Sequence, residues 1–198
     1  MQIIGGKFRS RRLQAPKGST TRPTSGRLRA TLFDICQSYI EGSSFLDVFA
    51  GGGAMGLEAI SRGADKAVFV EKAKGAISCI RKNVQLLEAE KQVEILSGDV
   101  LDVLPRLEKQ GRKFSIIYVD PPYEQMCRWK GNTLLYSEAV LKIIDEYDLL
   151  SPSGVLFLEE AKGQVFDEES LSSLVLLSSR NYGVSMLRQY QHHEEEKL

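Results

Sequence analysis

The chain has 198 residues with 42% hydrophobic side chains, and its 26 basic residues balance its 26 acidic ones. This length and composition predict a packed globular protein of one domain with at most a small appendage, and they exclude a disordered chain. There is no long apolar stretch and no signal-peptide layout, and three widely spaced cysteines match neither a disulfide framework nor a zinc site, so we expect a cytoplasmic protein with no membrane segment and no bound metal.

The charge is unevenly distributed along the chain. Residues 1–30 contain eight bases and no acid, so the rest of the chain has an excess of eight acids. A basic arm over residues 1–24 on an acidic body suggests a local contact with a polyanion, and a solvated, partly flexible tail is the alternative. The candidate contacts are basic side chains of the arm: Lys7, Arg9, Arg11, Arg12 and Arg22.

After the arm, Ser25 can cap a helix from about 26 to 39. Strand and helix patterns then alternate. The predicted strands are 44–49, 66–71, 92–96, 114–119 and 155–159, and the predicted helices are 54–61, 73–88, 100–109 and 133–147. Two further strands, 174–178 and 184–191, form a hairpin, and the charged tail 192–198 is expected to be frayed. This order predicts an α/β, Rossmann-like domain over residues 25–191, with a mostly parallel sheet and a C-terminal antiparallel hairpin.

A glycine-rich segment follows the first of these strands and opens the next helix. Gly51, Gly53 and Gly56 fit the nucleotide-binding pattern G-x-G-x-x-G, which lets a ligand approach the backbone closely. Glu71 ends the second strand 20 residues after Gly51, where a carboxylate can accept hydrogen bonds from ribose hydroxyls. Capping of the following helix is the alternative role for Glu71. The pattern predicts a nucleotide site at the carboxyl edge of the sheet.

Further candidate ligand contacts lie at the ends of the first and third strands. Asp47 can engage the ammonium group of a methionine-like moiety, directly or through water, and NAD has no such group. Asp99 can accept a hydrogen bond from an adenine amino group or cap the next helix, and the two roles are compatible. Phe49 and Val100, close to these acids, complete the set of candidate cofactor contacts.

The segment Asp120-Pro121-Pro122-Tyr123 follows the buried run 114–119. Its two prolines cannot continue a sheet ladder because neither donates a backbone hydrogen bond. The turn has a carboxylate before it and an aromatic ring after it. Such a pair can accept hydrogen bonds from the exocyclic amine of a nucleobase and stack on the base itself. These four residues are the candidate catalytic residues, and a strand-ending turn with a surface tyrosine is the alternative.

With these motifs in this order, preceded by Ile3-Ile4-Gly5-Gly6-Lys7 and Thr21-Arg22-Pro23-Thr24-Ser25, the chain resembles the bacterial RsmD-type methyltransferases over nearly its whole length. The resemblance implies a seven-stranded, S-adenosylmethionine-dependent methyltransferase fold. It also implies methylation of the exocyclic N2 of a guanine in 16S ribosomal RNA, within the small subunit or an assembly intermediate. The glycine turn would line the cofactor, with Glu71 on the ribose and Asp99 on the adenine. The Asp-Pro-Pro-Tyr segment would hold the flipped guanine. Gly52 departs from the family's usual Ser or Thr, and we expect a monomer.

Other interpretations stay open. The same tetrapeptide serves enzymes that methylate adenine N6 or cytosine N4, although these often have Asn first and a target-recognition insertion. A nicotinamide-dependent dehydrogenase would use the same glycines and acid, but it needs a nicotinamide site and usually a second domain. A non-catalytic RNA-binding assembly factor is the third alternative. Arg22-Pro23-Thr24 can lie over the cofactor's methionine end instead of on RNA.

Overall fold

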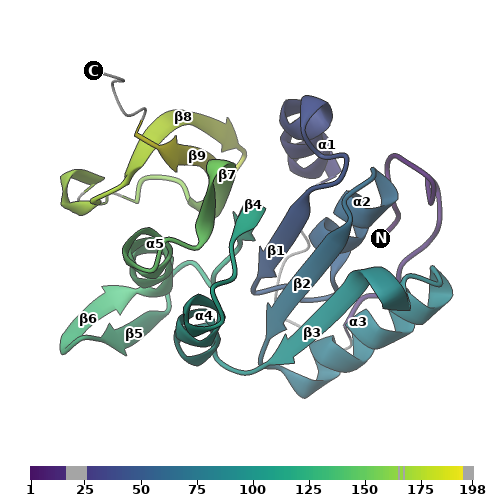
Figure 1. The fold of residues 1–198 in the computed structure, drawn as a ribbon, viewed down its shortest axis with the longest axis horizontal. Coiled ribbons are helices and arrows are strands. Elements are labelled where there is room, and N and C mark those ends of the chain that lie inside the picture. The colour runs from purple at the N-terminus through teal and green to yellow at the C-terminus, as the bar shows by residue number, and fades with distance from the viewer. Residues whose placement is uncertain (17–25, 165, 167, 194–198) are drawn as a thin grey trace. The chain divides into compact units, whose positions relative to one another are not determined.

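The computed structural model in Figure 1 describes residues 1–16, 26–164, 166 and 168–193. The chain divides into two compact units, Met1–Val103 and Leu104–Leu198, and the division falls inside α4 (Val100–Lys109). Seven of the described strands belong to one mostly parallel sheet with antiparallel C-terminal strands, which confirms the predicted α/β class. In the part of the chain that the structure describes, no helix is long and apolar enough to cross a membrane.

The first unit contains three parallel strands, β1 (Ser44–Val48), β2 (Lys66–Glu71) and β3 (Val93–Ser97), with β2 between the other two. Parallel neighbours need crossover connections, and the helices α2 (Ala54–Ser61) and α3 (Lys74–Leu86) supply them. The helix α1 (Gly26–Ile35) precedes β1 and continues into the short 3-10 helix η1 (Cys36–Ser38), close to the predicted end. Its predicted cap at residue 25 lies outside the described residues.

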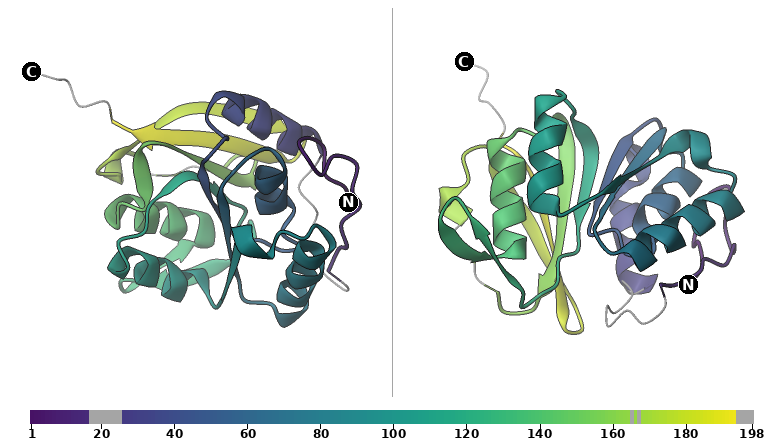
Figure 2. Two further views of the ribbon diagram at one scale, coloured as in Figure 1. Left: turned by 45° about the vertical axis from the view of Figure 1, so that its right-hand side comes forward. Right: turned by 90° about the horizontal axis from the view of Figure 1, so that it is seen from below.

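The start of the chain is a packed hairpin. Gln2 and Arg12 form an antiparallel bridge, and Ile3 accepts a backbone hydrogen bond from the N–H of Ser10. Ile3 and Leu13 are buried, so apolar side chains from both arms of the hairpin join the core. The alternative of a flexible tail is therefore wrong for residues 1–16, whose trace follows the helices of the first unit in Figures 1 and 2.

A buried acid in α2 fixes this hairpin. The carboxylate of Glu58 accepts hydrogen bonds from the backbone N–H groups of Ile4 and Gly5, each at 2.8 Å. A Cβ on Gly6, whose φ is +74°, would lie 1.7 Å from the carbonyl oxygen of Ser61. Gly6 is thus needed because the hairpin backbone touches the end of α2. All eight residues of α2 are buried as a result of its contacts with β1 and β2 and this hairpin cover.

The second unit contains β4 (Phe114–Val119), β7 (Leu150–Ala161), β9 (Ser185–His192) and β8 (Leu174–Tyr182), adjacent in that order. The pair β4–β7 is parallel, and β7–β9 and β8–β9 are antiparallel, as predicted for the C-terminal hairpin. The helix α5 (Tyr136–Glu146) makes the crossover from β4 to β7 and lies beside α4 in Figures 1 and 2. Strand β9 runs one residue into the predicted tail.

A separate two-stranded sheet in this unit was not predicted. The strands β5 (Met126–Trp129) and β6 (Asn132–Leu135) form an antiparallel hairpin. Its two loop residues, Lys130 and Gly131, have φ values of +48 and +84°, the signs that a type I′ turn requires. The helix predicted from 133 was wrong at its start, because β6 occupies those positions and α5 begins three residues later. Lys-Gly is a weaker hairpin signal than Asn-Gly or Asp-Gly.

Residues 151–154, which come directly before the predicted strand 155–159, lie inside β7. Pairing of β7 with β4 jumps from Leu150 opposite Phe114 to Val155 opposite Ile116, so β7 carries extra residues in an irregular bulge. A Cβ on Gly154 would lie 2.9 Å from the carbonyl oxygen of Ser151, which explains the glycine in this tight path.

Candidate functional site

The glycine turn between β1 and α2 has an unusual backbone. Phe49, Gly51 and Gly53 have φ values of +63, +54 and +79°. A non-glycine residue rarely adopts such an angle, and the conformation of Phe49 costs on the order of 1–3 kcal/mol. A Cβ built on Gly51 meets nothing within 4 Å, so the backbone there is bare and accessible to a ligand. Strain and bare backbone at the carboxyl end of a parallel strand are features of a binding site.

Asp47 lies beneath this turn. Its carboxyl group is buried, with 1% exposure, and its Oδ2 accepts a hydrogen bond of 2.9 Å from the N–H of Gly56. Burial raises the pKa of Asp47 to about 8, against the opposing effect of the Gly56 hydrogen bond. The side chain therefore fastens the start of α2 to β1. Its predicted contact with an ammonium group stays a prediction.

Glu71 connects the end of β2 to the glycine turn. Its Oε2 accepts a hydrogen bond of 2.8 Å from the N–H of Gly51, and its Oε1 accepts from the N–H groups of Lys72 and Ala73, also at 2.8 Å. A carboxylate offers about four acceptor positions. These three donors leave one position for a ligand hydroxyl, so Glu71 can hold the turn and one ribose hydroxyl at the same time.

Asp99 caps α4, one of the two roles that the sequence predicted for it. Its Oδ1 accepts a hydrogen bond of 3.1 Å from the N–H of Leu101. Its Oδ2 forms an ion pair of 3.0 Å with Nζ of Lys72. An adenine amino group would share this second oxygen with the lysine. Val100, the first residue of α4, is buried beside it.

Asn83 in α3 is a site residue that the sequence analysis missed. Its Oδ1 accepts a hydrogen bond of 2.8 Å from the N–H of Gln14, and its Nδ2 donates to the carbonyl oxygens of Gly52 at 2.9 Å and Gln14 at 3.1 Å. A Cβ on Gly52 would lie 3.2 Å from Cδ of Pro16. The end of the N-terminal hairpin thus packs where the family's usual Ser or Thr would place its side chain. The available signal in the sequence was an asparagine at the helical spacing of the apolar residues Ile77, Ile80 and Val84.

The Asp-Pro-Pro-Tyr segment begins where β4 ends. Pro121 is buried and Pro122 exposed, while Asp120 is half-buried. The carbonyl oxygen of Pro122 accepts a hydrogen bond of 3.2 Å from the N–H of Gln125, which closes a reverse turn directly before the β5–β6 hairpin. The prolines therefore end the strand as the sequence predicted.

The ring of Tyr123 is held by its hydroxyl group. The hydroxyl donates to Oε1 of Glu159 at 2.8 Å and lies 2.8 Å from Oγ of Ser185. Burial raises the pKa of Tyr123 above its ordinary value, and the negative charges of Glu159 and Asp120 act in the same direction. The phenol consequently stays protonated and remains a donor. The ring is half-buried and its hydroxyl is hydrogen-bonded, which argues against the alternative of a solvent-exposed surface tyrosine.

The basic candidates lie on the outside of the N-terminal hairpin. Lys7, Arg9, Arg11 and Arg12 are exposed, and Nζ of Lys7 donates a hydrogen bond of 2.8 Å to Oε1 of Gln92. The hairpin is anchored through its backbone, which leaves these side chains directed to solvent. Arg22 lies outside the described residues, so its predicted contact is not placed.

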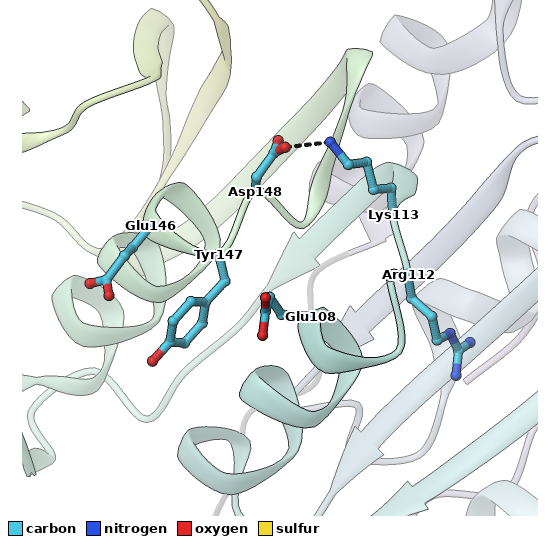
Figure 3. A pocket seen from close by; sticks show the side chains of 7 residues that line it. Glu108, Arg112, Lys113, Glu146, Tyr147 and Asp148 are labelled. Carbon is cyan, nitrogen blue, oxygen red and sulfur yellow. Dashed lines mark hydrogen bonds and ion pairs between the residues drawn. The ribbon is translucent and has the colours of Figure 1, made fainter.

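A cavity of about 290 Å³ in the second unit, shown in Figure 3, is not part of this site. Lys113, in its lining, precedes β4 and forms an ion pair with Asp148, whereas Asp120 follows the same strand. The length of β4 separates the cavity from the tetrapeptide by roughly 20 Å. The remaining lining residues are Glu108, Gly111, Arg112, Glu146 and Tyr147.

Comparison with known proteins gives matches over nearly the whole chain. A family model described as Conserved hypothetical protein 95 matches residues 1–191. A Bacillus subtilis protein named as a candidate rRNA methyltransferase, YlbH, is 31% identical over 185 residues, which cover 93% of this chain and 95% of that protein. The ribosomal RNA small subunit methyltransferase D of Haemophilus influenzae is 30% identical over 192 residues, or 96% and 93% of the two chains. A solved structure of a candidate methyltransferase from Escherichia coli, yhhF, has a TM-score of 0.80 at 27% identity and covers 98% of this chain and 99% of that one.

Proposed function

We propose, from the premise that the chain belongs to the Conserved hypothetical protein 95 family, that it is an S-adenosylmethionine-dependent methyltransferase acting on the exocyclic N2 of a guanine in 16S ribosomal RNA. The observation that carries the proposal is the match, over more than nine-tenths of the chain, to a relative named ribosomal RNA small subunit methyltransferase D. We further infer a monomer that works in the cytoplasm on the small subunit or an assembly intermediate.

The first unit fits the cofactor. The bare backbone at Gly51 allows close approach, and the remaining acceptor position of Glu71 suits a ribose hydroxyl. Oδ2 of Asp99 suits an adenine amino group, and Phe49 and Val100 adjoin these contacts. The cofactor supplies a methyl group that its sulfonium already activates. The protein therefore has to hold and aim the accepting nitrogen, and needs no strong base to create a nucleophile.

The tetrapeptide suits the target base. In guanine the lone pair of the amino nitrogen is delocalised into the ring, so the amine is a poor nucleophile. The carboxylate of Asp120 and the carbonyl oxygen of Pro121 would accept hydrogen bonds from its two hydrogens and stabilise the positive charge that develops on the nitrogen. The methylated nitrogen would then release one proton to the Asp120 carboxylate or to solvent. Tyr123 would stack on the everted base, which contributes about 1–3 kcal/mol and offsets part of the few kcal/mol that unstacking costs. Pro122 keeps this turn stiff.

The exposed bases of the N-terminal hairpin would contact phosphates around the target. Such contacts position an RNA without reading its sequence. The packed hairpin supports this role better than a flexible tail would, because its backbone is already ordered before RNA binds.

The experiment is methyl transfer from labelled S-adenosylmethionine to small ribosomal subunits that lack the modification. For Asp120→Ala we expect turnover to fall by about 10²–10³, the range seen when one stabilising group is removed, with an unchanged dissociation constant for the cofactor measured by calorimetry. Asp120→Asn, which keeps one acceptor oxygen, is the matched variant and should retain more activity. Wild-type turnover of Asp120→Ala would refute the assignment of this residue.

A further inference from the structure

A single buried carboxylate ties the Asp-Pro-Pro-Tyr segment to the sheet of the second unit. Glu159, near the end of β7, is only 4% exposed. Its Oε1 accepts from the hydroxyl of Tyr123 at 2.8 Å, and its Oε2 accepts from the hydroxyl of Tyr118 at 2.5 Å. Oγ of Ser185 lies 2.8 Å from the Tyr123 hydroxyl. Side chains from β7 and β9 thus meet the Tyr123 hydroxyl, and Tyr118 of β4 binds the other oxygen of the same carboxylate.

The strand register explains why these groups converge. Glu159 pairs with Leu187 and Ala161 pairs with Ser185 across β7 and β9. Partners lie on one face of a sheet and so do residues two apart, which puts Glu159 and Ser185 on the same face. Tyr118, opposite Phe157 in the parallel pair β4–β7, shares this face as well.

The arrangement fixes the direction of the carboxylate. A buried carboxylate is costly unless donors satisfy its oxygens. The Tyr118 hydroxyl satisfies Oε2, and this bond leaves Oε1 directed at Tyr123. Both partners of the Tyr123 hydroxyl are therefore attached to paired strands and not to loops. A ring held at its far end has fewer orientations to lose when a base stacks on it.

We propose that Glu159 is a positioning residue that sets the orientation of the Tyr123 ring for the target base. This inference rests on the proposed function and deepens it, because it names the group that prepares the stacking surface. Glu159 touches no substrate; it acts through Tyr123. If Glu159 had only a structural role, its replacement would lower stability, and the effect on catalysis would not depend on the Tyr123 hydroxyl.

The chain offers a matched control in the next residue. Glu160 lies on the opposite face of β7 and forms an ion pair with Arg188, which also pairs with Glu168. It is as buried as Glu159, with 1% exposure. Glu160→Gln therefore perturbs a buried acid of the same strand without touching the tyrosine hydroxyl.

The first test is a double-mutant cycle in methyl transfer to small subunits. Glu159→Gln and Tyr123→Phe should each lower kcat/KM by roughly tenfold, the effect of losing a hydrogen bond to a charged group. The double variant should be no worse than Tyr123→Phe alone, because Glu159 acts only through the hydroxyl that Tyr123→Phe removes. The dissociation constant of the cofactor should not change. The effects of Glu160→Gln and Tyr123→Phe on kcat/KM should be independent, so that they multiply in the double variant. The proposal would be overturned if the losses in kcat/KM of Glu159→Gln and Tyr123→Phe multiplied in the double variant, or if either single variant had wild-type kinetics.

A second measurement needs no activity. In protein with ring-¹³C tyrosine, the Tyr123 signal is the one that disappears in Tyr123→Phe. Glu159→Gln should shift this signal and change its line width, and Glu160→Gln should leave it in place; an unshifted signal in Glu159→Gln contradicts the positioning role. If the signal responds as expected while the wild-type protein methylates no guanine, the proposed function fails and the positioning contact stands. Should Glu159→Gln not fold, Ser185→Ala removes the other partner of the same hydroxyl and should likewise be non-additive with Tyr123→Phe.

Discussion

Replacing Gly56 by alanine tests whether the third glycine of the turn is required by packing. A Cβ there would lie 2.4 Å from Cε1 and 2.6 Å from Cζ of Phe69, a ring with no exposed surface. Overpacking of this kind costs about 1–3 kcal/mol, whereas alanine in place of a helical glycine contributes about 1 kcal/mol of stability. Because two ring atoms are too close and the ring is enclosed, the upper end of the cost applies. We expect a net loss of about 2 kcal/mol.

Gly75→Ala is the matched control. Gly75 lies in α3, and a Cβ there meets nothing within 4 Å, so the same substitution should stabilise the protein by up to about 1 kcal/mol. In thermal unfolding followed by circular dichroism, Gly56→Ala should lower Tm by roughly 4–8 °C, and Gly75→Ala should raise it slightly. A Tm of Gly56→Ala at or above the wild-type value would refute the packing argument. Equal losses in both variants would show that Phe69 is not the cause.

Two further predictions concern charged side chains. Burial raises the pKa of Asp47 to about 8, above the roughly 3.9 of an unfolded chain, so the folded state keeps a proton that the unfolded state releases, and stability falls as pH rises through this window. In urea unfolding between pH 5 and 8, the free energy of unfolding should fall less steeply with pH in Asp47→Asn than in the wild-type protein, by up to about 1.4 kcal/mol per pH unit. Parallel pH profiles of the two proteins would contradict this. Alanine in place of Arg9, Arg11 and Arg12 should flatten the log–log salt dependence of subunit binding by about one unit for each phosphate that these side chains no longer neutralise. The unfolding midpoint should stay the same because these side chains are exposed, and an unchanged salt slope would remove the hairpin from the RNA interface.

Much of the fold was predictable because its boundaries carry local signals. The glycine turn separates β1 from α2, and the helix occupies the predicted residues 54–61. The two prolines after Asp120 end β4 at the predicted residue, Val119. The β5–β6 hairpin lacked such a signal, since its turn uses Lys130 and Gly131. There the apolar residues of β6 were equally compatible with the first turn of a helix.

The contacts of the buried acids were not predictable. Glu58 interrupts an apolar helix and Glu159 follows an apolar run, and each acid in such a place indicates a buried partner. The partners themselves depend on the fold: Glu58 binds backbone N–H groups 53 and 54 residues away, and Glu159 binds Tyr123 from 36 residues away. For the same reason, residue types at strand ends indicated a nucleotide site but not the bonds that Asp47 and Glu71 already make within the protein.

The proposed reaction places a methyl group on the amino nitrogen of a guanine. The most direct test is mass spectrometry of nucleosides from 16S ribosomal RNA after small subunits have been incubated with the protein and labelled S-adenosylmethionine. We expect label in N2-methylguanosine, and labelling slower by about 10²–10³ with Asp120→Ala. Label in N6-methyladenosine or N4-methylcytidine, or no label although the subunits bind the protein, would contradict the proposed reaction.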